Sequence, residues 1–243
     1  MHAIVTGHSR GLGAAIAQCL LARGLTVLGL SRHGNPALAE RFATGLSEVS
    51  LDLSDPSSLC AALHTTPLKT FLAADGPALL INNAGMLQPV ARLGTQDAAA
   101  IVRAGQLNFI APLLLANAFA ATGRLERERR IVHVSSGAAR SAYAGWSIYG
   151  AGKAGLDHHA RAVAAEQHPW LRICSLAPGV IDTDMQAEVR ASDPADFPQR
   201  ARFDALKRDA LLTPAAIAAE RLVDYLLSDA FGRETVADLR QLA

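Results

Sequence analysis

The chain has 243 residues, of which 50% are hydrophobic and 19% are charged, a composition typical of one globular domain with a sizeable core. Lysine and arginine total 23 against 22 aspartates and glutamates, so the formal net charge of +1 excludes the strongly basic surface that binds nucleic acid or an anionic membrane. The three cysteines are far apart and form no CxxC pair, which predicts buried thiols.

The N-terminus opens directly on a strand-like run, HAIVTG, and lacks the basic, apolar and small-residue sections of a signal peptide. No apolar run approaches the roughly 18 to 20 residues needed to cross a bilayer, because polar residues such as Arg103 and Asn108 interrupt the richest stretches. We therefore expect a cytoplasmic protein.

Short β-like runs alternate with longer helical patterns from one end of the chain to the other. Strands are expected at residues 3–6, 26–30, 48–51, 78–82, 131–135, 172–176 and 235–238, and helices at 13–23, 36–43, 56–64, 97–121, 146–168 and 214–227. This alternation predicts an α/β fold: a single doubly wound, Rossmann-type parallel sheet with helices on both faces, in one catalytic domain over residues 1–243.

The least regular stretch runs over residues 182–207, which are polar and contain Pro194 and Pro198. A long excursion after a strand end is typical of a lid over a site, and we expect a substrate lid at about 182–212. A variable surface loop is the alternative.

The first strand is followed by TGHSRGLG and then by a helix. Glycines at a tight turn let an anion approach the backbone, and the helix N-terminus supplies N–H groups and a favourable dipole. The spacing G-x3-G-x-G lacks the Gly-Lys-Ser/Thr ending of a P-loop, which argues against ATP or GTP and favours a dinucleotide pyrophosphate. We expect His8, inside this loop, to be a neutral packing residue.

The second strand ends in Ser31-Arg32, where an NAD-binding fold offers an acidic residue to the adenosine ribose. A carboxylate would repel a 2′-phosphate, whereas a hydroxyl and a guanidinium would hold one. Arg10 of the glycine loop can reach the same corner, which gives two cations for a dianionic group. The pattern therefore favours NADP(H); an ordinary surface arginine is the alternative for Arg32.

Tyr149 and Lys153 stand at i and i+4 in SIYGAGK, so on a helix they share one face. Lowering the pKa of a tyrosine from about 10 to 7 needs roughly 4 kcal/mol of preferential phenolate stabilisation. A nearby ammonium and an oxidised nicotinamide could provide it. Taken alone, such a pair is usually an accident of a helix surface.

A pair of serines at a strand end and an asparagine before a proline are two further candidate site features. Ser135-Ser136 closes the strand RIVHVSS, at the carboxyl edge of the sheet. Asn108 lies four residues before Pro112, whose missing N–H leaves the carbonyl of residue 108 free to accept from a water or an ammonium. An ordinary helix kink is the alternative for Pro112.

Together these motifs resemble the classical short-chain dehydrogenase/reductase family from about residue 3 to residue 185. The motifs follow the family's order, and the intervals of 28 residues from Asn108 to Ser136 and 13 from Ser136 to Tyr149 are similar to the family's. The resemblance implies Tyr149 as proton donor to a carbonyl, Ser136 as the hydroxyl that orients its oxygen, Lys153 as ribose anchor, and Asn108 as the holder of a relay water.

The same resemblance implies a set of cofactor contacts: Gly7, Ser9, Arg10, Gly11, Leu12, Gly13, Ser31, Arg32, Asp52, Leu53, Asn83, Ala84, Gly85, Tyr149, Lys153, Pro178, Gly179, Ile181 and Thr183. Within the family, GWSIYGAGK and PGVIDTDMQ are similar to sepiapterin reductases and bacterial benzil reductases, which reduce vicinal dicarbonyl groups. This implies a substrate pocket lined by Ser136, Tyr143, Trp146 and Met185, and makes Asp238 a possible substrate anchor.

We therefore expect an NADPH-dependent reductase of a small ketone or dicarbonyl, without a metal, that assembles as a homo-dimer or homo-tetramer and binds neither nucleic acid nor membrane. Two alternatives remain open. One is an NAD-linked alcohol dehydrogenase with the same machinery, and the other is a non-catalytic regulator that senses a dinucleotide.

Overall fold

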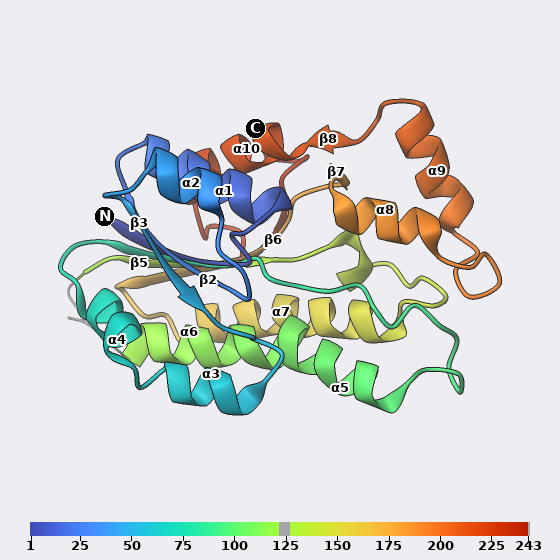
Figure 1. The fold of residues 1–243 in the computed structure, drawn as a ribbon, viewed down its shortest axis with the longest axis horizontal. Helices are drawn as coiled ribbons and strands as arrows, with labels where there is room; N and C mark the ends of the chain where they lie inside the picture. Colours follow the sequence, from blue (N-terminus) through green and yellow to red (C-terminus); the bar gives the residue numbers. More distant parts are fainter. Residues whose placement is uncertain (122–126, 243) are drawn as a thin grey trace.

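A seven-stranded, all-parallel sheet forms the centre of the protein in the computed structural model, which describes residues 1–121 and 127–242 (Figure 1). The strand order is β3-β2-β1-β4-β5-β6-β9. The strands are β1 (His2–Thr6), β2 (Thr26–Ser31), β3 (Leu46–Ser50), β4 (Ala78–Asn82), β5 (Arg129–Val134), β6 (Leu171–Ala177) and β9 (Val236–Asp238). The doubly wound parallel sheet predicted from the sequence is confirmed.

The chain changes direction across the sheet between β1 and β4. From β1 it runs outward through β2 to β3, and then returns to pair β4 with the other side of β1. In open sheets of this kind, ligands bind beyond the carboxyl ends of the strands at the reversal point. The topology therefore places the candidate site beyond Thr6, Ser31, Asn82 and Val134.

Helices cover both faces of this sheet (Figure 1). One layer contains α1 (Gly11–Ala22), α2 (Pro36–Arg41) and α10 (Ala215–Leu227), and the other contains α3 (Pro56–Ala62), α4 (Thr66–Ala73), α5 (Ala98–Gly105), α6 (Ala111–Ala121) and α7 (Ser147–Ala165). Strands β1, β4 and β5 are buried along their whole length, because apolar clusters pack on both of their faces.

Local sequence explains where several helices begin. Asn35 accepts a hydrogen bond from the N–H of Leu38, and Asp97 accepts one from the N–H of Ala100, so each side chain caps a helix start. Helices α2, α3 and α4 each carry a proline in the first turn, where the missing N–H costs no helical hydrogen bond.

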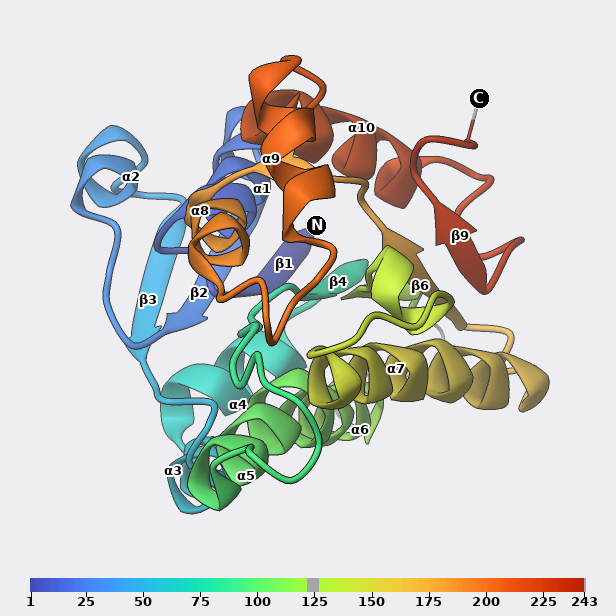
Figure 2. The ribbon, with the colours of Figure 1, turned by 90° about the vertical axis from the view of Figure 1, so that its right-hand side faces the viewer.

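The segment expected to be irregular contains two helices, α8 (Asp184–Ala191) and α9 (Arg200–Arg208). They stand beyond the short pair of strands β7 (Ile181–Asp182) and β8 (Thr213–Pro214), at one end of the molecule (Figure 1). This end faces the viewer in Figure 2. Phe197 and Phe203 from this segment are buried in a separate apolar cluster with Trp146. These two phenylalanines therefore form the core of a small layer, and the tryptophan on which they pack lies about 50 residues earlier in the sequence.

The helical segment Ala98–Ala121 also differs from the sequence expectation. By length and composition it is the one segment, among the described residues, that is apolar enough to cross a membrane. In this structure it covers the sheet instead, with Ala111, Leu115 and Phe119 packed into the core on that face. It is interrupted by a π-helical turn at Gln106–Ile110, which ends two residues before Pro112.

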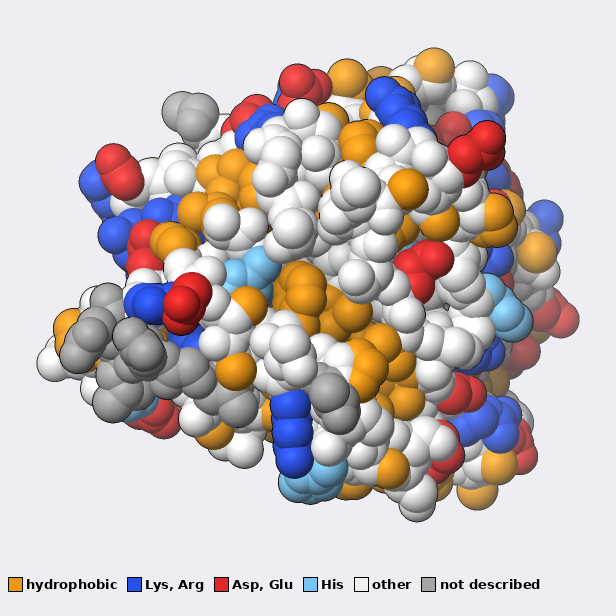
Figure 3. Space-filling model, turned by 60° about the vertical axis from the view of Figure 1, so that its left-hand side comes forward, with side chains coloured by type: hydrophobic (Ala, Val, Ile, Leu, Met, Phe, Trp, Pro, Cys, Tyr) orange, Lys and Arg blue, Asp and Glu red, His pale blue; other side chains and the backbone are white. Residues whose placement is uncertain are grey.

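The face of the molecule shown in Figure 3 carries charged side chains of both signs, interspersed around a central group of hydrophobic side chains. This mixture agrees with the near-balanced totals of acidic and basic residues in the sequence.

We predict that Gly13→Ala destabilises the fold by about 2 kcal/mol or more, because a Cβ at this position would lie 2.1 Å from the carbonyl oxygen of Gly7. The change in the free energy of unfolding can be measured in urea. Gly105→Ala is the matched control: no atom lies within 4 Å of its Cβ position in the helix, so we expect stabilisation by about 0.5–1 kcal/mol. An unchanged free energy of unfolding in Gly13→Ala would contradict the close approach of residue 13 to the backbone of Gly7.

Candidate active site

The loop between β1 and α1 has the shape of an anion cradle. Gly7 and Gly11 have φ values of +69° and +56°, a region that favours glycine, and Gly13 lies against the backbone of Gly7. Arg10 occupies the N-cap position of α1 without capping it by its side chain, and the first turn contains no acidic residue. The N–H groups at the start of α1 are therefore available to an anion.

The segment that follows β4 is tied to the end of β1. The backbone N–H groups of Asn83 and Ala84 both donate to the Thr6 hydroxyl at 2.9 Å, and the Asn83 side chain donates to the Thr6 carbonyl at 2.9 Å. This network holds residues 83–85 beside the glycine loop, across the reversal point of the sheet.

The end of β2 forms one corner of the site. Ser31 is buried there and Arg32 is exposed beside it. The Ser54 hydroxyl donates to Asp52 at 2.6 Å and lowers the pKa of this carboxyl, with a further lowering from the charge of Arg32. Arg10, expected at this corner, instead lies 3.1 Å from Asp184 of α8, and both side chains are about three-quarters exposed.

Tyr149 and Lys153 point from α7 toward the end of β5, and both are buried (7% and 4% exposed). Burial raises the pKa of the Tyr149 phenol above its ordinary value, and a hydrogen bond with Ser136 opposes this rise. The phenol is therefore protonated near neutral pH, which is the form that can donate a proton.

The Lys153 ammonium donates to the carbonyl of Val134 at 2.7 Å and lies 5.8 Å from the centre of the Tyr149 ring. Burial lowers the pKa of Lys153 to about 8, against the opposite effect of the Asp157 carboxylate one turn further along α7. The sequence hypothesis has Lys153 lowering the pKa of Tyr149; in this structure burial outweighs any such effect.

Asp157 was not identified from the sequence, although it follows Lys153 at i+4. It is 2% exposed and accepts hydrogen bonds from the hydroxyls of Ser135 and Ser175, at 2.6 Å and 2.7 Å. Asp157 thus joins α7 to the ends of β5 and β6, next to Ser136.

Asn108 lies in the π-helical turn and is 1% exposed. Its amide group holds the backbone of Met86 from both sides: the Met86 N–H donates to Oδ1 at 2.9 Å, and Nδ2 donates to the Met86 carbonyl at 2.8 Å. Both ends of the side-chain amide are therefore engaged with Met86. The main-chain carbonyl of Asn108 stays the group expected to hold a water.

A cavity of about 900 Å³ joins these groups. All the predicted cofactor contacts line it, as do Ser136, Tyr143, Trp146 and Met185, whereas Asn108 stands behind its wall. Its lining also includes polar residues that the sequence did not indicate, among them Gln186, Glu188, Arg202 and Arg240. Asp238, the possible substrate anchor, is not in this lining; it is 6% exposed and paired with Arg240 at 2.6 Å.

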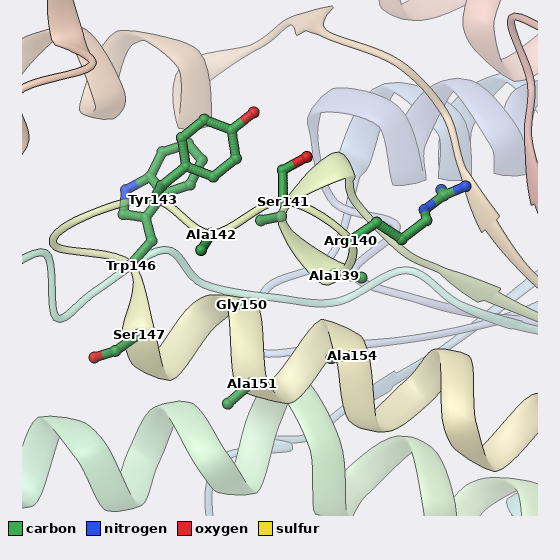
Figure 4. Close-up of a pocket in the computed structure, with 11 residues that line it drawn as sticks. Ala139, Arg140, Ser141, Ala142, Tyr143, Trp146, Ser147, Gly150, Ala151 and Ala154 are labelled. Carbon is green, nitrogen blue, oxygen red and sulfur yellow. The ribbon is translucent and has the colours of Figure 1, made fainter.

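A second cavity, of about 420 Å³, lies between the loop after β5 and the first turns of α7 (Figure 4). Gly150, Ala151 and Ala154 form its helical side, and Tyr143 and Trp146 line both cavities. Trp146 is 6% exposed and stacks on Phe197 with 4.5 Å between ring centres, so it supports the segment that covers the site.

Comparison with known proteins gives three kinds of match. The family model described as short chain dehydrogenase matches residues 1–194. A benzil reductase ((S)-benzoin forming) from Bacillus cereus is 33% identical over 240 residues, covering 95% of each chain, and the sepiapterin reductase of Bos taurus is 33% identical over 94% of this chain and 90% of its own. The crystal structure of a short-chain dehydrogenase/reductase from Burkholderia vietnamiensis is 45% identical, with a TM-score of 0.72 over 100% of this chain and 98% of that one.

We predict that Lys153→Met changes how stability depends on pH. An ordinary lysine pKa of 10.5 applies to the unfolded chain and about 8 to the folded protein, so between these values the unfolded chain binds more protons. The free energy of unfolding of the wild type should therefore rise by about 3 kcal/mol relative to the variant from pH 8 to 10.5. Urea titrations at several pH values measure this difference, and a constant difference would contradict the buried ammonium.

Proposed function

Because the chain belongs to the short-chain dehydrogenase family, whose members are oxidoreductases that bind nicotinamide dinucleotides, we propose that it is an NADPH-dependent reductase of a small ketone or vicinal dicarbonyl. One observation carries the proposal. Ser136, Tyr149 and Lys153 meet at the carboxyl end of β5, on the wall of the cavity that the glycine loop also lines.

The residues around the cavity fit a dinucleotide. The uncapped start of α1 and the glycine loop would hold its pyrophosphate, and Ser31 with Arg32 would hold a 2′-phosphate. Asp52 and Leu53 would contact the adenine, Asn83, Ala84 and Gly85 would support the ribose side, and the segment from Pro178 to Thr183 would meet the nicotinamide. Reduced nicotinamide supplies a hydride when it is bound.

Three side chains of the chain would act on the carbonyl. Tyr149 donates the proton to the carbonyl oxygen, which its protonated phenol allows. The half-buried Ser136 hydroxyl, hydrogen-bonded to Tyr149, orients that oxygen. Lys153 anchors the ribose and, with the main-chain carbonyl of Asn108, returns a proton to Tyr149 through water.

The relatives and the wall of the cavity support the proposed substrate class. The relatives include a benzil reductase and a sepiapterin reductase. In the cavity, Tyr143, Trp146 and Met185 provide flat and apolar surface near Ser136. Residues 182–212 serve as the lid: Phe197 and Phe203 pack on Trp146, and the Arg10–Asp184 ion pair joins α8 to the glycine loop.

The proposal extends to a cytoplasmic homo-dimer or homo-tetramer built on the helices that carry Asn108 and Tyr149. Val102 and Ile110, on the same helical segment as Asn108, are 71% and 40% exposed, which supports an apolar contact there.

We predict that Tyr149→Phe lowers kcat for NADPH-dependent reduction of benzil by about 10²- to 10⁴-fold, because the proton donor is lost, while the Kd for NADPH changes little. Loss of absorbance at the reduced nicotinamide band measures the rate. Tyr225→Phe is the matched control, since Tyr225 packs against Phe231 away from the cavity and should keep full activity. Undiminished turnover in Tyr149→Phe would rule out this proton donor.

We also predict that NADPH binds more tightly than NADH, and that Arg32→Ala weakens NADPH by on the order of tenfold without weakening NADH, since only NADPH carries the 2′-phosphate. Arg41→Ala is the control and should change neither Kd. Arg41 is exposed at the end of α2, where its guanidinium lies over the ring of Phe42. Calorimetric titration with each dinucleotide measures both constants. Tighter NADH binding by the wild type would favour the NAD-linked alternative.

A further inference from the structure

His8 is a glycine-loop residue that reaches across the sheet. It is 1% exposed, and its ring passes over Gly29 of β2, where a Cβ would lie 2.4 Å from the ring atoms. Gly29 pairs in register with Glu48 of β3, and His8 Nε2 lies 2.6 Å from Glu48 Oε1. The glycine in mid-strand therefore opens the path by which the imidazole meets this carboxylate.

The hydrogen bonds around the ring assign its protons. Ser31 Oγ donates its single proton to the carbonyl of His33 at 2.6 Å, so it can only accept from His8 Nδ1, which lies 3.1 Å away. Nε2 faces a carboxylate oxygen, which also accepts. Both ring nitrogens therefore face acceptors, and only a doubly protonated, cationic imidazole donates to both at once.

This pair lies at the corner assigned above to the 2′-phosphate. Ser31, Arg32 and Gly34 line the cavity there, and Glu48 Oε2 lies 3.1 Å from the position that a Cβ on Gly34 would take. The Asn35 N–H donates to Glu48 at 2.7 Å, and the Asn35 side chain donates to the Ser9 carbonyl at 3.2 Å. The carboxylate is therefore held in place beside the corner by two loops.

The other charges at this corner nearly cancel. Arg10 is paired with Asp184, and the charge of Arg32 acts on Asp52. Without a charge on His8, the carboxylate of Glu48 would be left uncompensated, and it would repel a dianionic phosphate.

We propose that His8 is a specificity-determining residue for the cofactor: as a buried cation it neutralises Glu48 and holds the Ser31 hydroxyl in place, so that the corner accepts a 2′-phosphate. This role replaces the neutral packing role expected from the sequence. It rests on the proposed use of NADPH, and it assigns the preference to a pair of side chains that do not themselves line the cavity.

The test compares the wild type with His8→Asn, Glu48→Gln and the double variant, using calorimetric titration of NADPH and NADH and no substrate. His8→Asn should raise the Kd for NADPH by on the order of tenfold and leave the Kd for NADH within about twofold of the wild-type value. The double variant, which removes both charges, should recover NADPH binding to within about threefold of the wild type. Glu48→Gln alone should bind NADPH at least as tightly as the wild type does.

Equal weakening of both dinucleotides in His8→Asn, or no recovery in the double variant, would show that the histidine only supports the loop. Should His8→Asn not fold, Glu48→Gln decides, because a selective loss of NADPH in this variant would overturn the proposal. A wild type that binds NADH as tightly as NADPH would refute the cofactor preference itself; the change in the ratio of the two constants on His8→Asn would still test the role of His8.

Discussion

The burial of one ammonium between α7 and β5 is the constraint on which the candidate site depends. Lys153 donates to the Val134 carbonyl, and one turn further along α7 Asp157 accepts from Ser135 and Ser175. A buried charge is tolerated only when its hydrogen bonds are made, so α7 cannot slide or rotate against the sheet without leaving polar groups unpaired. This fixes Tyr149 at the end of β5, beside Ser136.

Close contacts at two glycines fix the loops on the cofactor side of the cavity. Gly13 lies against Gly7, and the absent side chain of Gly29 admits the His8 ring. Three loops that are distant in the sequence, after β1, β2 and β4, are thereby drawn to one edge of the sheet, where Thr6, Ser31 and Asn83 connect them by hydrogen bonds. Contacts among these three loops thus form the dinucleotide end of the cavity.

The opposite end of the cavity is built differently. Helices α8 and α9 are attached through apolar rings, with Phe197 and Phe203 on Trp146, and through exposed ion pairs such as Arg10–Asp184 and Lys207–Asp182. Exposed pairs contribute little to stability, so the aromatic cluster carries most of this attachment. An attachment of this kind supports the lid role proposed for residues 182–212.

The sequence by itself determined the alternation of strands and helices, the glycine turn and the place of Tyr149 and Lys153 on one helix face, because each depends on local spacing along the chain. The choice of Ser136 over Ser135 came from the resemblance to the family. Tertiary structure alone decided the rest. Residues 182–207 contain two helices that pack on the sheet end through Phe197, Phe203 and Trp146. Arg240 joins the lining of the cavity because β9 pairs with β6. The pairing of His8 with Glu48, of Arg10 with Asp184 and of Asp157 with two strand ends joins residues 18 to 174 positions apart. Such contacts leave no local pattern, since burial and partner choice are set only when distant segments pack together.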